Sequence, residues 1–180
     1  MTSPGTSKGP LLSAISSDQS GIDFNNTITE SPQLNYFTYV YAYNGGGVAV
    51  GDIDNDGLQD LYFTGNQVSD KLYRNLGGLK FEDITEKAIG PKAREGWRTG
   101  VTMADVNADG HLDIYVSRAG TSNSHALTAN LLYMNNGDGT FTERANELGV
   151  ADTSQSTQAA FFDADLDGDL DLHVINHPLG

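Results

Sequence analysis

Short apolar runs of about four residues divide the chain from residue 46 onward into strand-sized segments. Two such runs flank the polar stretch 52–60, and the same arrangement returns around 105–113 and 163–171. Runs of this length, rich in Val, Ala, Ile, Leu, Tyr and Phe, are typical of strands and too short for helices. The pattern therefore predicts three strand–loop–strand units, whose polar stretches begin at residues 52, 105 and 163.

A second pair of strands is predicted in each of the first two units. Residues 71–83 and 130–143 both contain a short apolar strand, a Gly-containing turn and a strand that opens with Phe. In the later segment the turn 136–139 favours a hairpin, because Asn, Asp and Gly tolerate a positive φ. A brief helical turn is expected after each hairpin, stopped by a glycine. These helical turns are predicted at Glu86–Ile89 and Ala145–Leu148.

The predicted fold is all-β, with blades of four antiparallel strands in roughly 50 residues, which is the size of a propeller blade. The repeats cover about 46–95, 96–155 and 156–180, the last of them incomplete. Because repeats bury their apolar faces against neighbours, we expect the remaining blades to be supplied in cis or by oligomerisation. The aromatic-rich segment 21–46 is expected to supply strands that cover one end.

The N-terminal segment differs from the repeat region in its pattern of polar and apolar residues. Residues 1–20 are polar and rich in Ser, Gly and Pro, which predicts a disordered leader or a cloning remnant, followed by the repeat region 21–180. The leader has no apolar core of the kind that a signal peptide carries. No apolar run approaches the ~18 residues of a membrane span, so none is predicted.

Charge narrows the possible partners. The net charge is −14, from 24 acidic and 10 basic residues, and such a surface repels phosphate backbones, which argues against nucleic-acid binding. Eleven of the 24 acidic residues occupy repeated positions in the three polar stretches. Clustered carboxylates need neutralising, and cations can do this. The absence of cysteine excludes disulfides and thiolate metal sites.

The three polar stretches share the pattern Asp-x-Asp/Asn-x-Asp-Gly-x-x-Asp, and we call 52–60 loop one, 105–113 loop two and 163–171 loop three. When such a loop coils around a centre, the side chains at positions one, three and five converge and Gly at position six permits the turn. The carbonyl at position seven and the carboxylate at position nine add oxygens. Calcium takes six to eight such hard oxygens, whereas zinc prefers imidazole or thiolate.

The sequence therefore predicts about three Ca²⁺ ions, one in each loop. In loop one the ligands are Asp52, Asp54, Asp56, the carbonyl of Leu58, and Asp60. In loop two they are Asp105, Asn107, Asp109, the carbonyl of His111, and Asp113. In loop three they are Asp163, Asp165, Asp167, the carbonyl of Asp169, and Asp171. Loop two carries one carboxylate fewer and is expected to bind most weakly.

Two familiar types of calcium loop do not fit these stretches. An EF-hand or dockerin loop needs helices on both sides and an acidic residue at position twelve, where this chain has Phe63, Val116 and Val174. Tandem nine-residue β-roll repeats are excluded by the long period. The remaining alternative is Asp/Gly turns without metal, but carboxylates gathered this closely would repel one another strongly.

Several non-repeated residues could carry other chemistry. His173 and His177 could share zinc on a helix, but they lie at a predicted strand end before Pro178. Trp97 could stack on a sugar, although blade packing is the favoured interpretation. The arginines 94, 98 and 118 could contact an anionic ligand, and a solvated or ion-paired surface is favoured for them. A nucleophile–base pair from residues 122, 124 and 125 lacks a Gly-x-Ser-x-Gly elbow, so a polar surface loop is favoured there. The three arginines are Arg94, Arg98 and Arg118. The residues of the possible nucleophile–base pair are Ser122, Ser124 and His125.

The repeated residues closely resemble the FG-GAP/VCBS repeats of integrin-α-like β-propellers. The segment 47–62 together with the Leu-Tyr-x-Asn-x-Gly and Phe-x-Asp-Ile-Thr elements resembles the cartilage acidic protein/UnbV-type branch. The resemblance covers residues 20–180. It implies blades, often seven, calcium in the Asp loops, and a secreted or surface-attached protein whose export signal is not in this chain.

Two functional classes remain. The first is a calcium-binding extracellular module that acts as a binding, adhesion or scaffold domain for protein or carbohydrate. The second is a polysaccharide-active enzyme, or part of one, in which calcium is structural. Every repeated carboxylate is better explained as a metal ligand than as a catalytic acid or base, so no catalytic residue is predicted and binding is favoured. The expected location is extracellular, periplasmic or at the cell surface.

Overall fold

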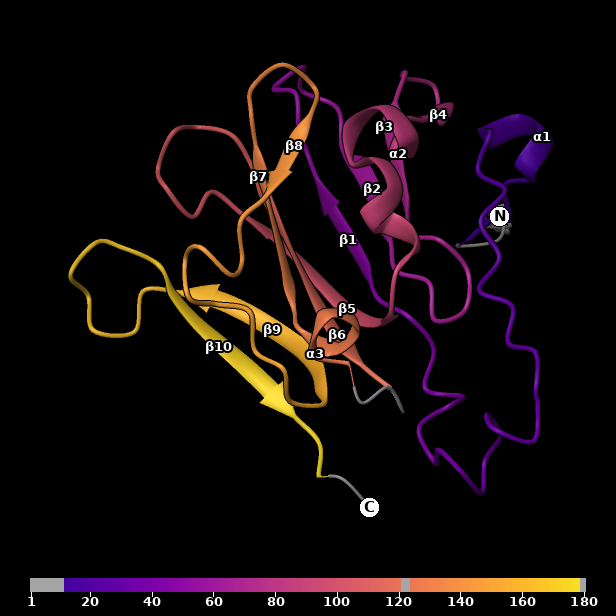
Figure 1. The fold of residues 1–180 in the computed structure, drawn as a ribbon. Coiled ribbons are helices and arrows are strands. Elements are labelled where there is room, and N and C mark those ends of the chain that lie inside the picture. The colour runs from indigo at the N-terminus through magenta and orange to yellow at the C-terminus, as the bar shows by residue number, and fades with distance from the viewer. Residues whose placement is uncertain (1–11, 121–123, 179–180) are drawn as a thin grey trace, which may run out of the picture.

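The computed structural model describes residues 12–120 and 124–178, and in them three antiparallel sheets lie beside one another (Figure 1). The first sheet contains β1 (Val48–Gly51), β2 (Asp60–Phe63), β3 (Lys71–Asn75) and β4 (Phe81–Asp83). The second contains β5 (Trp97–Ala104), β6 (Asp113–Ala119), β7 (Leu131–Asn135) and β8 (Phe141–Glu143), and the third contains β9 (Ser156–Phe162) and β10 (Asp171–Asn176).

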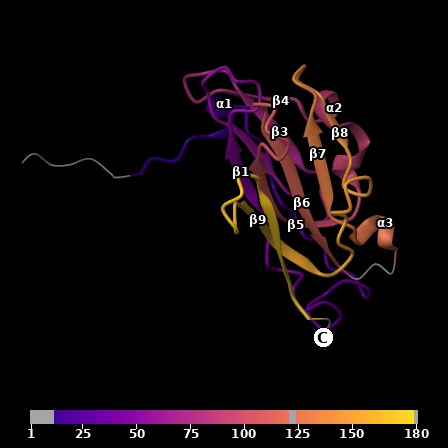
Figure 2. The same ribbon diagram turned by 90° about the vertical axis from the view of Figure 1, so that its left-hand side faces the viewer.

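Each sheet is a meander in which strands next to one another in sequence pair in space. The strand orders are β1-β2-β3-β4, β5-β6-β7-β8 and β9-β10, and every pairing is antiparallel. The first strands of the three sheets, β1, β5 and β9, are neighbours (Figure 2). This arrangement confirms the predicted all-β fold built of four-stranded, blade-like units.

The helices of the described residues are short and lie in the connections. They are α1 (Ser17–Ser20), α2 (Thr85–Ala88), the 3₁₀ turn η1 (Gly90–Arg94) and α3 (His125–Thr128). The first predicted helical turn is thus present as α2, one residue earlier than expected, and the second is a hydrogen-bonded turn at 145–149. No helix in the described ranges is long and apolar enough to cross a membrane.

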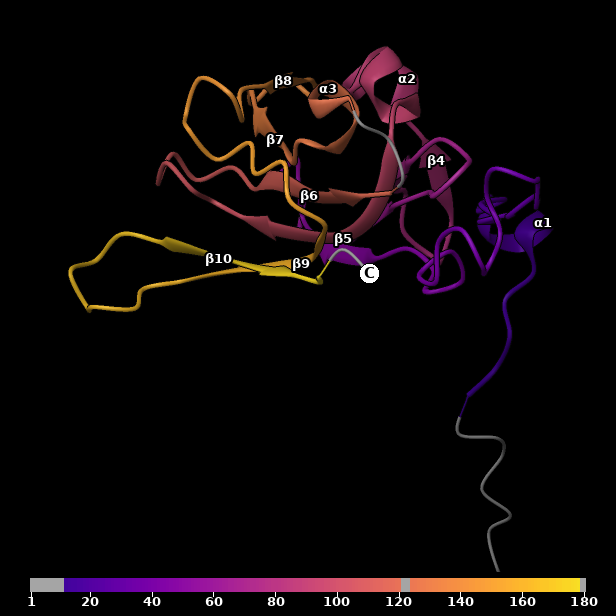
Figure 3. The same cartoon turned by 60° about the horizontal axis from the view of Figure 1, so that its bottom comes forward.

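Alternation along the strands places one apolar cluster in each gap between sheets. The cluster between the first and second sheets includes Tyr62, Leu72, Val101, Ile114 and Tyr133. The cluster between the second and third sheets includes Tyr115, Leu132, Met134, Ala145 and Ala159. Since successive residues of a strand face opposite ways, β6 contributes Ile114 to one cluster and Tyr115 to the other. The second sheet is therefore covered on both faces, and Figure 3 shows β9 and β10 lying along β5 and β6.

The first strands of the sheets, β1, β5 and β9, form contacts between one sheet and the next. Four residues before the first Asp of loops two and three, Val101 and Ala159 are 4% and 3% exposed, because each packs on the preceding sheet. The equivalent residue of the first sheet, Val48, is 55% exposed. The outer face of β1 is thus an apolar sheet face that no described residue covers.

Buried polar pairs join the sheets at the end of the strands away from the Asp loops. Between the first two sheets Arg98 Nε donates to Asp70 Oδ1 at 2.8 Å, and both side chains are almost completely buried. At the equivalent place between the second and third sheets, Asn130 Nδ2 donates to Ser156 Oγ at 2.8 Å. One contact between sheets is therefore charged and its counterpart is neutral.

The segment 21–46 differs from its prediction. It contains no strand, only an isolated bridge between Ser31 and Leu34, and it runs as coil and turns past the first two sheets (Figure 1). The Asn35 side chain accepts hydrogen bonds from the backbone N–H groups of Phe37 and Thr38. Such local bonds compete with sheet pairing, and the prediction of strands here was wrong.

The predicted leader falls partly outside the described residues, which begin at residue 12. Within it α1 ends at Gly21, whose φ of 78° stops the helix. A side chain at Gly21 would meet the Phe81 carbonyl oxygen at 2.5 Å, so the chain enters the fold by passing close to β4. The assignment of 1–20 as a disordered leader stays a prediction.

Candidate metal centres

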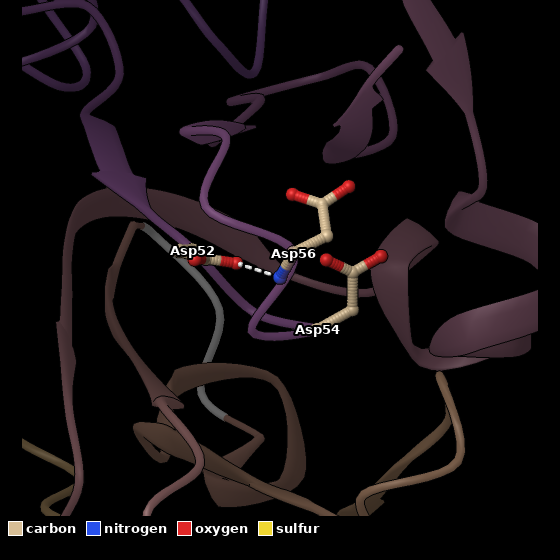
Figure 4. Close-up of side chains that lie close together, drawn as sticks. All are labelled: Asp52, Asp54 and Asp56. Carbon is tan, nitrogen blue, oxygen red and sulfur yellow. Dashed lines mark hydrogen bonds between the residues drawn. The ribbon is translucent and has the colours of Figure 1, made fainter.

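Loop one gathers three carboxylates at the turn between β1 and β2. One carboxylate oxygen from each of Asp52, Asp54 and Asp56 lies within 4.8 Å of the other two (Figure 4). The three residues alternate along the loop, so the coiled backbone turns their side chains toward one centre. This is the convergence that the sequence predicted for positions one, three and five.

Hydrogen bonds from the backbone hold this loop in shape. Asp52 accepts from the N–H groups of Asp56 and Gly57 at 3.1 and 2.8 Å, and Asp56 Oδ1 accepts from Leu58 N at 2.8 Å. The same three bonds recur in the other loops. In loop two they are Asp109 N and Gly110 N to Asp105, and His111 N to Asp109. In loop three they are Asp167 N and Gly168 N to Asp163, and Asp169 N to Asp167.

The backbone reverses through two left-handed residues in every loop. Position six is Gly57, Gly110 or Gly168, with φ between 87° and 99°, as the sequence pattern requires. Position four also lies in this region: Asn55, Ala108 and Leu166 have φ of 59°, 57° and 64°. A non-glycine residue in this conformation is uncommon. Asn tolerates it, but the residue types of Ala108 and Leu166 do not indicate it.

The carboxylate at position nine is buried beneath loops one and two. Asp60 is 0% exposed, and its oxygens accept from Ile53 N at 2.9 Å and Asn75 N at 2.7 Å. Burial, followed by the nearby charges of Asp54 and Asp56, raises the pKa of Asp60 although these hydrogen bonds oppose the shift. The pKa of Asp113, its equivalent in loop two, is raised for the same reasons.

In loop three the carboxylates that come together are those at positions one, three and nine of the Asp pattern. Oxygens of Asp163, Asp165 and Asp171 lie within 4.8 Å of one another, so position nine takes part here and position five does not. The pKa of Asp169, at position seven, is raised, chiefly by the adjacent charge of Asp167. Positions one and three therefore converge in both loops, joined by position five in loop one and by position nine in loop three.

Loop two has the same backbone bonds but fewer acids. Asn107 replaces the carboxylate at position three, and its Nδ2 donates to Asp109 Oδ2 at 2.8 Å. The backbone N–H of His111, followed by Asn107, lowers the pKa of Asp109. No trio of acidic groups is found in loop two among the described residues. Its donor set is two carboxylates and an amide, with Asp113 beneath.

The donors in these loops fit calcium. Carboxylate, amide and carbonyl oxygens are hard ligands, and six to eight of them suit Ca²⁺ at about 2.3–2.6 Å. The one imidazole in the loops belongs to His111, whose Nδ1 lies 3.3 Å from Asn55 Nδ2, so it is turned to a neighbouring loop. The residues that the structure brings together could hold a divalent cation in loops one and three.

A repeated asparagine outside the Asp pattern supports loops one and two, and the sequence-based prediction of ligands had missed it. Asn135, at the end of β7, donates from its backbone N–H to Asp113 Oδ1 at 2.8 Å. Its side-chain Nδ2 donates to the Leu112 carbonyl in loop two and to the Ile53 carbonyl in loop one, at 3.2 and 2.8 Å. Asn135 therefore ties two loops of different sheets together.

The equivalent residue of the first sheet is Asn75. Its backbone N–H donates to Asp60 Oδ1, and its Nδ2 donates to the Gln59 carbonyl at 2.8 Å, without a bond to another sheet. The repeated Leu-Tyr-x-Asn element was the available signal, because an Asn at the same place in two units points to a shared role.

Loops one and two also contact each other directly. The Asn55 side chain donates to the Gly110 carbonyl at 3.0 Å. Asn55 is the left-handed residue at position four, so the backbone turn itself directs this side chain toward the next sheet. A cleft of about 360 Å³, lined in part by Asp54, Arg74 and His111, lies between the two loops.

The remaining candidates from the sequence lie away from the Asp loops. The His177 ring packs on Tyr41 with centroids 3.8 Å apart, and nothing brings it together with His173. Trp97 lies edge-on to Tyr39, 5.5 Å between centroids, in agreement with packing. Arg94 pairs with Glu86 on the surface at 2.5 Å, as favoured. Ser122 lies outside the described residues, and Ser124 and His125 stand at the start of α3.

The prediction that the three arginines lie at a solvated or ion-paired surface was wrong for two of them. Arg98 and Arg118 are each 1% exposed. Their strands place them on the faces that meet neighbouring sheets, and the register of the sheets was not available from the sequence. Arg98 meets Asp70 there, whereas Arg118 has no carboxylate within ion-pair distance in the described part of the chain.

Two segments of the chain match the model of a protein family. The model of the FG-GAP-like repeat matches the chain twice, at residues 52–116 and 119–174, which together exceed half of its length. The first match begins at loop one and takes in loop two, and the second contains loop three. No curated protein matches the chain.

Proposed function

Since the chain belongs to the FG-GAP-like repeat family, we propose that it is a calcium-binding extracellular repeat module. It acts as a binding, adhesion or scaffold domain for a protein or carbohydrate ligand. The observation that carries the proposal is the convergence of Asp52, Asp54 and Asp56 and of Asp163, Asp165 and Asp171. Carboxylates this close repel one another unless a cation lies between them.

The bound ions would stabilise the fold rather than take part in a reaction. Each loop joins two strands that contribute to the contact between sheets, so a cation that closes the loop also fixes those strands. We propose about three ions, one for each loop, with the weakest binding at loop two because Asn107 carries no charge. A titration resolved by site in which loop two bound most tightly would contradict this order.

The proposed location is outside the cell, in the periplasm or at the cell surface, where calcium can fill sites of modest affinity. Further blades, in the same polypeptide or from another copy, would cover the outer face of β1, where Val48 is exposed. A propeller of about seven blades and kinship with the cartilage acidic protein/UnbV-type branch are part of the same proposal.

We favour binding over catalysis. The repeated carboxylates are held by backbone N–H groups in the loops, which suits metal ligands better than acid–base groups. A polysaccharide-active enzyme with structural calcium is the second candidate. Turnover on a panel of glycans that survives changes in the Asp loops, but is lost on changing one residue outside them, would establish it instead.

Thermal unfolding tests the central proposal. A ligand that binds only the folded state raises the midpoint as its concentration increases. We expect the midpoint to rise in calcium, to change little in magnesium, and to fall in chelator. Asp52→Asn should remove most of loop one's share of the rise, whereas Asp138→Asn, in the β7–β8 turn, should leave the rise unchanged. No calcium-dependent shift, with calorimetry also silent, would refute the proposal.

A further inference from the structure

The buried Arg118 is a charge without a counter-ion. It lies in β6 on the face turned toward the first sheet, and 1% of it is exposed. Its Nη2 donates to the Ala126 carbonyl, and its Nε has no partner in the described structure. Burying a cation without an anion is strongly unfavourable, and the other buried arginine, Arg98, meets Asp70.

The acidic groups around Arg118 do not neutralise it. Glu143 is engaged by Lys92, whose Nζ lies 2.6 Å from Glu143 Oε2. This ion pair contributes to lowering the pKa of Glu143. Glu95 is exposed; its charge acts on the pKa of Arg118, but the two form no ion pair in the described part of the chain. The one buried guanidinium of the described chain that lacks a carboxylate therefore keeps an unused N–H donor.

A cleft of about 450 Å³ opens onto this guanidinium. It lies between η1 of the first sheet and the α3 connection of the second, and its lining includes Arg118, Lys92, His125, Asn146 and Thr153. This volume is in the range of small-molecule sites. The walls offer amide, hydroxyl and imidazole groups around the one buried cation, together with Glu95 and the Lys92–Glu143 ion pair. The cleft is separate from the Asp loops.

We propose that this cleft binds the carboxylate of a small hydroxylated acid, with a hexuronic acid as the class that fits best. The planar guanidinium is suited to carboxylate, and as the buried charge in the lining of the cleft it favours an anionic group there. Asn146, Thr153 and His125 at the rim pair with hydroxyl groups. The proposal does not depend on calcium in the Asp loops.

The test uses the whole chain, saturated with calcium, titrated with D-glucuronate and followed by the ¹⁵N signal of the arginine Nε groups. We expect the Arg118 signal to shift with saturation while the Arg94 signal stays in place. D-glucose has the hydroxyls without the charge, and acetate has the charge without the hydroxyls, so both should bind at least about tenfold more weakly.

Variants give a second readout by calorimetry. Arg118→Gln should weaken glucuronate binding about tenfold or more, whereas Arg94→Gln, an exposed arginine on η1, should leave it unchanged. Glucose binding as well as glucuronate would overturn the role of the carboxylate, and acetate binding equally well would overturn the hydroxylated class. If the wild-type Arg118 signal does not move, the cleft is not an acid-binding site, whatever the stability of the variants.

Discussion

The carboxylate of Asp60 illustrates what a single residue does in this molecule. It is fully buried and accepts two backbone hydrogen bonds, so it closes the loop and lies beside the proposed ion. Burial raises its pKa above the ordinary value near 4, and Asp113 behaves alike. In the metal-free folded protein these groups therefore take up protons at a higher pH than in the unfolded chain.

The raised pKa of Asp60 determines the direction in which its contribution to the free energy of unfolding changes with pH. Because the folded state holds more protons, the contribution of Asp60 to the free energy of unfolding falls as the pH rises from about 4 through the raised pKa. Calcium needs the deprotonated carboxylate, so protons and calcium compete. We predict that the calcium-induced rise in melting temperature is smaller at pH 5 than at pH 7.5. An equal or larger rise at pH 5 would contradict it.

At the residue scale, the sequence predicted part of the convergence of carboxylates, because the spacing of acidic residues along a coiled loop determines which side chains face its centre. Asp52, Asp54 and Asp56 come together as expected. The left-handed conformation of Ala108 and Leu166 could not be predicted, since neither residue type favours it. That conformation is imposed by the hydrogen bonds of the whole loop, and a residue's own preference does not reveal it.

At the scale of elements, the ends of the third strands link the loops to the sheets. Asn135 bonds loops one and two, while Asn75 bonds only its own loop. We predict that Asn135→Ala lowers the free energy of unfolding by about 1 kcal/mol more than Asn75→Ala does, because one additional buried carbonyl is left unpaired. Urea unfolding of both variants in calcium measures the difference. A larger loss for Asn75→Ala would show that the bond between loops contributes little.

The buried pairs between sheets allow a second comparison. Asp70→Asn alone leaves Arg98 buried without a counter-ion and should lower the free energy of unfolding by about 3–5 kcal/mol. Adding Arg98→Ser recreates the neutral Asn130–Ser156 pair found at the next contact between sheets, and should recover most of that loss. Chemical unfolding of the single and double variants tests this. A double variant no more stable than Asp70→Asn would mean that the two contacts between sheets are not equivalent.

Strand-level prediction succeeded where the sequence repeats and failed where it does not. The units around the Asp loops were found because alternation and turn residues agree with each other. The segment 21–46 was wrongly expected to form strands, because its aromatic residues favour sheets while its Asn, Ser and Thr residues bond locally to the backbone. Burial of Arg98 and Arg118 depends on which sheet each strand faces, and that register involves segments far apart in sequence.

At the scale of the whole molecule, the first strands of successive sheets present equivalent apolar residues to the neighbouring sheet. Val101 and Val48 occupy the same place in successive units, yet they are 4% and 55% exposed. We predict that Val101→Lys lowers the free energy of unfolding by about 3 kcal/mol, since it buries a charge between sheets. Val48→Lys should change it by less than about 0.5 kcal/mol. Equal losses, measured by denaturant titration at concentrations where the chain is monomeric, would mean that β1 is already covered.

The backbone hydrogen bonds inside each Asp loop have a consequence for how such a molecule can change. In every loop they run to Asp52, Asp105 or Asp163. Where position three adds a bond, the amide oxygen of Asn107 and the carboxylate oxygen of Asp165 accept alike from the N–H at position five. Position three can therefore exchange a carboxylate for an amide, as at Asn107, and the loop keeps its shape. The proposed affinity for metal can then differ from one repeat to the next while the architecture stays constant. A single ancestral loop could in this way give rise to a graded series of calcium thresholds within one molecule.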